Sequence, residues 1–191
     1  MRSSVRRGAM RRQGNRISIL VMAGGLGRRF GGAGKIFTEV CGKRLIERVL
    51  EAVSKLGEIY IAVSPHTKAY SEDLCRIYRC IETRGKGYPW DLSEALSKLE
   101  KPVLVLPADL PFITSDAIES FLSKAFEVGK PVVTLRVCRE GSCKPIGISL
   151  IAGDGSSWAN IDYQYSEVFM DIDTVEDLIR AGEICGSTAA R

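Results

Sequence analysis

Glycines and basic side chains are concentrated in one loop near the start of the chain, a composition suited to holding phosphates. The loop follows the apolar run Ile17–Met22, which predicts a buried β-strand. Glycine lets backbone N–H groups turn toward an anion, and arginine and lysine supply the countercharge. The alternative, a mobile surface loop, is disfavoured by the preceding strand and by the lack of acidic residues in the loop. The residues expected to contact phosphate are Ala23, Gly24, Gly25, Gly27, Arg29 and Lys35.

The spacing of this loop excludes two common phosphate-binding motifs. A Walker A loop requires a glycine where Arg29 stands and a hydroxyl residue where Ile36 stands. A dinucleotide-binding fingerprint requires a third glycine where the chain has Phe30, followed directly by a helix. Because glycines continue to Gly34, no helix is expected to open there. The loop therefore binds phosphate in another way, and other residues must decide its chemistry.

Acidic residues after two other predicted strands suit a divalent metal ion that faces this loop. Asp109 lies just past the apolar strand Val103–Leu106, between two prolines. Asp171 and Asp173 lie at the end of the predicted strand Val168–Ile172, and alternation places both on one face. Carboxylates are the ligands that Mg²⁺ prefers, so we predict a Mg²⁺ site made by Asp109 with Asp171 or Asp173. A turn or a helix cap is the alternative role for each acid, whereas their pairing indicates phosphoryl or nucleotidyl transfer.

A second glycine-rich loop, residues 83–92, is a candidate for further nucleotide contacts. Its glycines permit close approach of the backbone to a base or a phosphate. Lys86 can pair with a phosphate, and Asp91 can either cap the following helix or accept hydrogens from a purine edge. A plain glycine-rich turn is the alternative. The predicted nucleotide contacts in this loop are Thr83, Gly85, Lys86, Gly87 and Asp91.

Two further segments are relevant to substrate contact. The run at residues 144–148 predicts a strand with a bulge at Gly147, where a substrate can approach the backbone. Pro145 and Gly147 are therefore assigned to substrate binding. His66, the single histidine, lies in a Ser-Pro-His-Thr loop and is expected to be exposed.

The elements that position these residues alternate between strand and helix. Such alternation predicts an α/β fold, a single Rossmann-like three-layer domain with a mostly parallel sheet. Ligands bind such sheets outside the carboxyl ends of the strands, so the loops above are expected to share one crevice. The expected strands are residues 17–22, 59–63, 79–82, 103–106, 132–137, 146–151 and 168–172. The expected helices are 43–56, 68–78, 89–99, 115–126 and one capped by 174–177, with a polar loop over 152–162.

Charge is divided unevenly along the 191 residues. Six of the 27 basic residues are arginines in the first 16 positions, where there is no acid, which leaves 21 basic against 23 acidic side chains. A near-neutral body argues against a nucleic-acid-binding domain. Residues 1–15 are expected to be a dispensable basic leader, either a disordered arm or an extension ahead of a start at Met10, with the folded domain over 16–185 and a tail over 186–191. The sequence shows no apolar secretory signal and no run long enough to span a membrane, so a cytoplasmic location is expected.

Six cysteines stand at positions 41, 75, 80, 138, 143 and 185. Their spacing lacks the C-x-x-C pairs that are typical of structural zinc sites. We expect most of them to be buried or half-buried thiols, and a Cys138–Cys143 disulfide across a turn remains an open alternative.

Three motifs together resemble the nucleotidyltransferases related to molybdenum-cofactor guanylyltransferase, whose fold is of the nucleotide-diphospho-sugar transferase type. They are the loop 23–35, the Asp109 segment and the D-I-D-T-x-E-D-L run at 171–178. Within this superfamily the chain is similar to the archaeal GTP:adenosylcobinamide-phosphate guanylyltransferases, on the runs at 64–67, 85–92 and 145–148. The resemblance covers residues 16–185. One departure is Gly34-Lys35-Ile36, where family members often have Glu-Lys-Pro.

The resemblance implies Mg²⁺-dependent transfer of GMP from GTP to adenosylcobinamide phosphate, with pyrophosphate leaving. It assigns Arg29, Lys35 and Asp109 to catalysis, the two basic residues neutralising phosphate charge and Asp109 holding Mg²⁺. We expect no nucleic-acid partner, no membrane span, and a monomer or homodimer. Three alternatives remain: molybdopterin guanylylation or cytidylyl transfer to another small phosphate, a GTP-sensing module without catalysis, and nucleic-acid binding through the leader.

Overall fold

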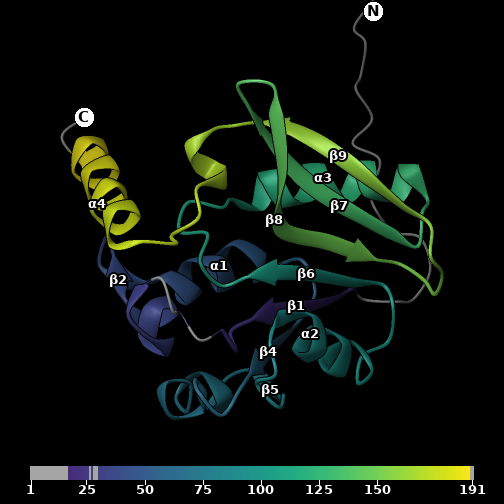
Figure 1. The fold of residues 1–191 in the computed structure, drawn as a ribbon, viewed down its shortest axis with the longest axis horizontal. Coiled ribbons are helices and arrows are strands. Elements are labelled where there is room, and N and C mark those ends of the chain that lie inside the picture. Colours follow the sequence, from purple (N-terminus) through teal and green to yellow (C-terminus); the bar gives the residue numbers. More distant parts are fainter. Residues whose placement is uncertain (1–16, 26, 28–29, 190–191) are drawn as a thin grey trace, which may run out of the picture.

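A seven-stranded β-sheet forms the centre of the molecule (Figure 1). The computed structural model describes residues 17–25, 27 and 30–189, so the expected leader over residues 1–15 lies outside the described residues. In the described part, β8 runs antiparallel to both of its neighbours and the other strand pairs of this sheet are parallel, which confirms the mostly parallel sheet. In spatial order the strands are β5 (Arg79–Glu82), β4 (Glu58–Val63), β1 (Ser18–Met22), β6 (Val103–Pro107), β8 (Ser142–Ile151), β7 (Val132–Arg139) and β9 (Trp158–Gln164).

Helices cover both faces of the sheet and produce the three layers expected from the sequence (Figure 1). α1 (Leu45–Val53) and α3 (Ser115–Val128) pack on one face, and α2 (Tyr88–Leu96) packs on the other. Side chains of β1 alternate between these layers: Ile19 belongs to the apolar cluster under α1 and α3, and Leu20 to the cluster under α2. Burial on both faces explains why the strand is continuously apolar from Ile19 to Met22.

The C-terminal helix α4 (Val175–Ala189) lies beside the sheet and packs near the hairpin of β2 (Glu39–Val40) and β3 (Lys43–Arg44) (Figure 1). Its start is capped reciprocally, because the Asp177 N–H donates to the Thr174 hydroxyl and the Asp177 carboxylate accepts the Thr174 N–H. This arrangement confirms the predicted capping box. Among the helices that the structure describes, none is long and apolar enough to cross a membrane.

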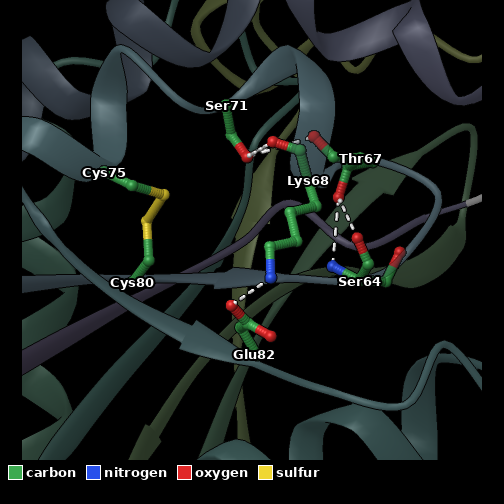
Figure 2. Close-up of a disulfide and its surroundings, with 7 residues drawn as sticks. All are labelled: Ser64, Thr67, Lys68, Ser71, Cys75, Cys80 and Glu82. Atoms are coloured by element: carbon green, nitrogen blue, oxygen red, sulfur yellow. Dashed lines mark hydrogen bonds and ion pairs between the residues drawn. A yellow bond between two sulfur atoms is a disulfide. The ribbon is translucent and has the colours of Figure 1, made fainter.

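Two short 3-10 helices, η3 (Lys68–Tyr70) and η4 (Leu74–Arg76), replace the single helix expected over 68–78. These two helices lie in the segment 64–78 that connects β4 to β5, here called the crossover. Figure 2 shows the hydroxyl groups of Thr67 and Ser71 bonded to the backbone of this crossover. Local side-chain bonds of this kind compete with the helical hydrogen-bond ladder. The expectation of one continuous helix was therefore wrong.

Two further expectations are corrected near the end of the chain. The strand β9 occupies much of the predicted polar loop 152–162; its side chains alternate between exposed and half-buried, as in a sheet-edge strand with one solvated face. The expected strand 168–172 is instead the 3-10 helix η5 (Glu167–Phe169) followed by irregular chain. The reason is that Ile172 N–H donates to the carbonyl oxygen of Asp109 at 3.0 Å rather than to a neighbouring strand.

Other predicted helices are present with shifted ends. The helix expected over 43–56 begins at Leu45, because the two preceding residues belong to β3, and it ends at Val53. The helix expected over 89–99 is α2, which ends at Leu96. The helix expected over 115–126 is α3, and its N-cap Thr114 accepts the Ala117 N–H.

The six cysteines are all paired as disulfides: Cys41–Cys185, Cys75–Cys80 and Cys138–Cys143. The expectation of mostly free thiols was therefore wrong, and the one pairing left open is present. Cys75–Cys80 lies beside the crossover of Figure 2, and Cys41–Cys185 joins the β2–β3 hairpin to α4. Sequence spacing gave no sign of the second of these because 144 positions separate its partners.

Candidate active site

A cleft of about 310 Å³ lies at the carboxyl ends of β1, β5 and β6. Parallel sheets bind their ligands at this edge. The cleft therefore brings together the two glycine loops, Asp109 and Asp173, which the sequence predicted to share one crevice. Nine of the predicted site residues line it: Gly24, Gly25, Gly27, Lys35, Gly85, Gly87, Asp91, Asp109 and Asp173.

The first glycine loop turns sharply at Gly27. This residue has a φ of +57°, and a Cβ there would overlap the carbonyl oxygen of Gly32. The Gly27 carbonyl oxygen accepts the N–H groups of Phe30 and Gly32 at 2.9 and 3.0 Å. Only glycine fits at this corner, where the loop folds back on itself. Arg29, predicted to contact phosphate and to be catalytic, lies outside the described residues.

Lys35 lies on the 3-10 helix η2 (Ala33–Phe37) and joins three segments that are far apart in sequence. Its Nζ donates to Asp109 Oδ2 and to the Ile172 carbonyl oxygen, each at 2.6 Å, and lies 3.5 Å from Asp173 Oδ1. The Lys35 side chain is only 12% exposed, so solvent ions screen these interactions weakly. The ammonium therefore lies where the glycine loop, the Asp109 loop and the run before α4 meet.

The carboxylates around Lys35 are of the chemical type that binds divalent metal ions. Asp109 and Asp173 approach the same ammonium, which concentrates negative charge there. The pKa of Asp171 is raised above its ordinary value, first because surrounding protein displaces water from it and then because Asp173 and Asp109 are negative. Oxygen donors with surplus negative charge fit a hard divalent cation.

Six predicted site residues are not among those that line the cleft: Ala23, Thr83, Lys86, Pro145, Gly147 and Asp171. Ala23 and Thr83 are buried, and both bond to backbone carbonyls of β4. Lys86 borders a separate hollow on the far side of its loop.

Gly147 forms the predicted bulge in β8, but it faces protein. It has a φ of +84°, and a Cβ there would lie 3.2 Å from the ring of Pro107, which lines the cleft. The pairing of β7 with β8 shifts register between Thr134 and Arg136, beside this position. Glycine thus lets β8 lie close against the end of β6, its neighbour in the sheet.

Tyr88 also lines the cleft; the sequence marked it as part of the run 85–92 that carries the resemblance, but not as a site residue. It begins α2, and the pKa of its hydroxyl is raised, first by desolvation and then by the negative charge of Asp109. The apolar side of the cleft comes from six residues that were not predicted as site residues: Met22, Phe30, Ala33, Ile36, Pro107 and Ala108.

Ser64 supports the start of the first glycine loop from behind. It follows β4 and is 2% exposed; its hydroxyl donates to the Gly24 carbonyl oxygen at 2.8 Å and accepts the His66 N–H at 3.2 Å. The Thr67 hydroxyl in turn accepts the Ser64 N–H (Figure 2). His66 is exposed, as predicted, and its ring lies against Gly85 of the second glycine loop. This crossover therefore contacts both glycine loops.

Replacing Ser64 with alanine is expected to lower the free energy of unfolding by about 1–3 kcal/mol, because the Gly24 carbonyl loses a buried donor. Nucleotide binding should weaken as well, since the loop start is no longer held. Urea unfolding and calorimetric titration measure the two effects. Ser54→Ala is the matched control, because the exposed Ser54 hydroxyl donates to the Glu51 carbonyl oxygen outside the cleft. Equal effects of the two substitutions would argue against this positioning role.

Comparison with known sequences places most of the chain in one family. Residues 19–152, more than half of the chain, match the family profile described as MobA-like NTP transferase domain. Adenosylcobinamide-phosphate guanylyltransferase from Methanocaldococcus jannaschii is 38% identical over 111 residues, which cover 54% of this chain and 57% of that protein. Molybdenum cofactor guanylyltransferase from Pseudomonas syringae pv. tomato is 30% identical over 121 residues, 62% of this chain and 60% of that protein. The chain thus spans between half and two thirds of the length of these relatives.

Solved structures show the same fold. Molybdopterin-guanine dinucleotide biosynthesis protein A from Archaeoglobus fulgidus matches with a TM-score of 0.67 at 21% identity, over 90% of this chain and all of that chain. The inositol-1-phosphate CTP transferase from T. maritima matches with a TM-score of 0.70 at 15% identity, over 91% of this chain and 96% of that chain. The profile match over residues 19–152 shows that the protein belongs to the MobA-like NTP transferase domain family.

Proposed function

We propose that this protein transfers GMP from GTP to adenosylcobinamide phosphate and releases pyrophosphate. The observation that supports nucleotidyl transfer is the meeting of Lys35 with Asp109 and Asp173 beside the glycine loop, in one cleft. The choice of acceptor rests on the 38% identity to the archaeal enzyme named for that substrate.

The cleft is suited to an in-line displacement at the α-phosphorus of GTP. In this proposal the phosphates would contact backbone N–H groups of the first glycine loop, Arg29 is a phosphate partner proposed from the sequence alone, and Lys35 would neutralise charge on the α-phosphate and on the incoming phosphate. A phosphate oxygen of the acceptor forms a bond to the α-phosphorus. The bond from the α-phosphorus to the oxygen that bridges to the β-phosphate breaks, and its electron pair leaves with pyrophosphate. Because the nucleophile is already an anion, catalysis needs positioning and charge neutralisation rather than a general base.

Asp109, with Asp171 or Asp173, would hold Mg²⁺, which neutralises phosphate oxygens when bound. Lys35 now pairs with Asp109 and Asp173. With phosphates in the cleft, the Lys35 ammonium would have a phosphate partner, and the carboxylates of Asp109 and Asp173 would be available to hold the metal ion. The same three side chains thus serve in two pairings, which explains why they are held together so closely.

A panel of nucleotides and acceptors tests this proposal. GTP, ATP, CTP and UTP are each combined with adenosylcobinamide phosphate, molybdopterin or inositol phosphate in the presence of Mg²⁺, and pyrophosphate release is measured. The highest rate is expected for GTP with adenosylcobinamide phosphate, and EDTA is expected to stop release. A higher rate with molybdopterin would favour the activity named for the molybdenum-cofactor relatives. GTP binding without acceptor-dependent release would instead indicate a sensing module.

A further inference from the structure

Asp91 is a carboxylate buried in the wall of the cleft. It lies in the first turn of α2, is 4% exposed, and lines the cleft together with Gly85 and Gly87. It also borders the hollow on the far side of the second glycine loop. Burial of a carboxylate is costly unless donors or cations surround it. The groups that bond to the Asp91 carboxylate therefore bear on its role in the cleft.

Protein groups donate a hydrogen bond to only one of the two oxygens of the Asp91 carboxylate. The Lys86 N–H donates to Oδ1 at 3.2 Å, and the helix start favours a negative charge there. Among the described residues, no hydrogen bond reaches Oδ2 and no cation pairs with Asp91. The carboxylate therefore keeps capacity for further donors at the wall of a cleft built for an anionic ligand.

Glu94, on the same helix, anchors the second glycine loop through Arg84. Its carboxylate accepts the Arg84 N–H at 3.0 Å and lies 3.7 Å from the Arg84 guanidinium. Glu94 borders only the outer hollow and is partly exposed. A carboxylate can thus hold the loop from outside the cleft, so loop anchoring does not explain why Asp91 is buried at the cleft wall.

We propose that Asp91 is the specificity-determining residue that selects guanine. The inference rests on the proposed use of GTP. Guanine presents two adjacent donors, N1–H and the 2-amino group, which a carboxylate can accept as a pair. Adenine and cytosine each present a ring-nitrogen acceptor beside their amino group, and that acceptor repels a carboxylate. The buried, negative wall at Asp91 therefore favours guanine and disfavours the other two.

Nucleotide affinities test this inference without an acceptor substrate. Calorimetric dissociation constants are measured with Mg²⁺ for GTP, ITP, which lacks the 2-amino group, and XTP, which has a 2-carbonyl group. The natural chain should bind GTP about tenfold to a hundredfold more tightly than ITP, the usual range for a hydrogen bond to a charged group. In Asp91→Asn the side-chain oxygen still accepts the Lys86 N–H, but an amide N–H₂ faces the base. GTP should bind more weakly, and XTP should gain relative to GTP because its 2-carbonyl accepts that donor.

Glu94→Gln is the matched control, since it makes the same acid-to-amide change on the same helix outside the cleft. It should leave the GTP-to-ITP ratio unchanged. A GTP preference over ITP that survives Asp91→Asn would overturn the inference and leave the proposed function intact. If the Asp91 variant does not fold, the affinities of the natural chain still test the inference. Equal affinity for GTP and ITP would contradict the role of Asp91 without contradicting the proposed function. Equal affinity for GTP, ATP and CTP contradicts the proposed use of GTP itself.

Discussion

Lys35→Ala is expected to slow pyrophosphate release by about 100-fold or more, the usual loss when a preorganised charge is removed from a transition state. The Lys35 ammonium is partly buried and lies 2.6 Å from Asp109, so its charge acts with little screening at the place where phosphates are expected. The effect should appear mainly in kcat, because charge builds up at the α-phosphate during the displacement. Steady-state pyrophosphate release with GTP and adenosylcobinamide phosphate measures it.

Two comparisons make this prediction specific. Lys35→Arg keeps the charge but replaces a compact ammonium with a planar fork, so an intermediate rate is expected. Lys43→Ala removes an exposed lysine that pairs with Glu51 outside the cleft, and its rate should stay near that of the natural chain. Circular dichroism establishes that each variant is folded. A near-normal rate in folded Lys35→Ala would rule out the assignment of Lys35 to catalysis.

Asp109→Asn is expected to reduce turnover to a similar extent, about 100-fold or more. The amide keeps the shape of the side chain and removes the charge that would bind Mg²⁺ and that now holds Lys35. The Mg²⁺ concentration needed for half-maximal rate should rise, which separates loss of a metal ligand from loss of packing. Titration of the rate with Mg²⁺ provides this readout.

The control for Asp109 is Asp154→Asn, since Asp154 is an exposed aspartate that pairs with Lys101 away from the cleft. Its rate and Mg²⁺ dependence should match those of the natural chain.

The double variant Lys35→Ala with Asp109→Asn tests whether the two residues act together. Residues that act as one unit are not additive, so it should be about as slow as the slower single variant. Full additivity would indicate that the two residues act independently.

The central part of the fold could be predicted because its signals are local. The run Ile17–Met22 is apolar on both faces, and Thr174 and Asp177 form a cap within four residues. Each of these features depends on neighbours in the sequence, which a single sequence displays directly.

Features that depend on distant contacts could not be predicted. The expected topology placed the Lys35 loop and Asp109 in one crevice, but no local pattern predicted the bonds of Lys35 to Asp109 and to the Ile172 carbonyl oxygen, across 74 and 137 positions. The segment ending at Ile172 is apolar enough for a strand, but its backbone bonds to the Asp109 loop instead. The prediction of one helix over 68–78 was wrong because the Ser71 hydroxyl donates to backbone carbonyls. Such local bonds compete with the regular helix, and the sequence does not show which of the two forms.

The partners of Lys35 do not all lie inside the segment that defines the family. The family match ends at residue 152, whereas the Ile172 carbonyl and Asp173 lie beyond it. A chain cut at that boundary would retain the glycine loop and Asp109 but leave Lys35 with one anchor of three. The site proposed around Lys35 therefore extends beyond the family match, and an exchange of this domain between relatives should include the segment up to α4.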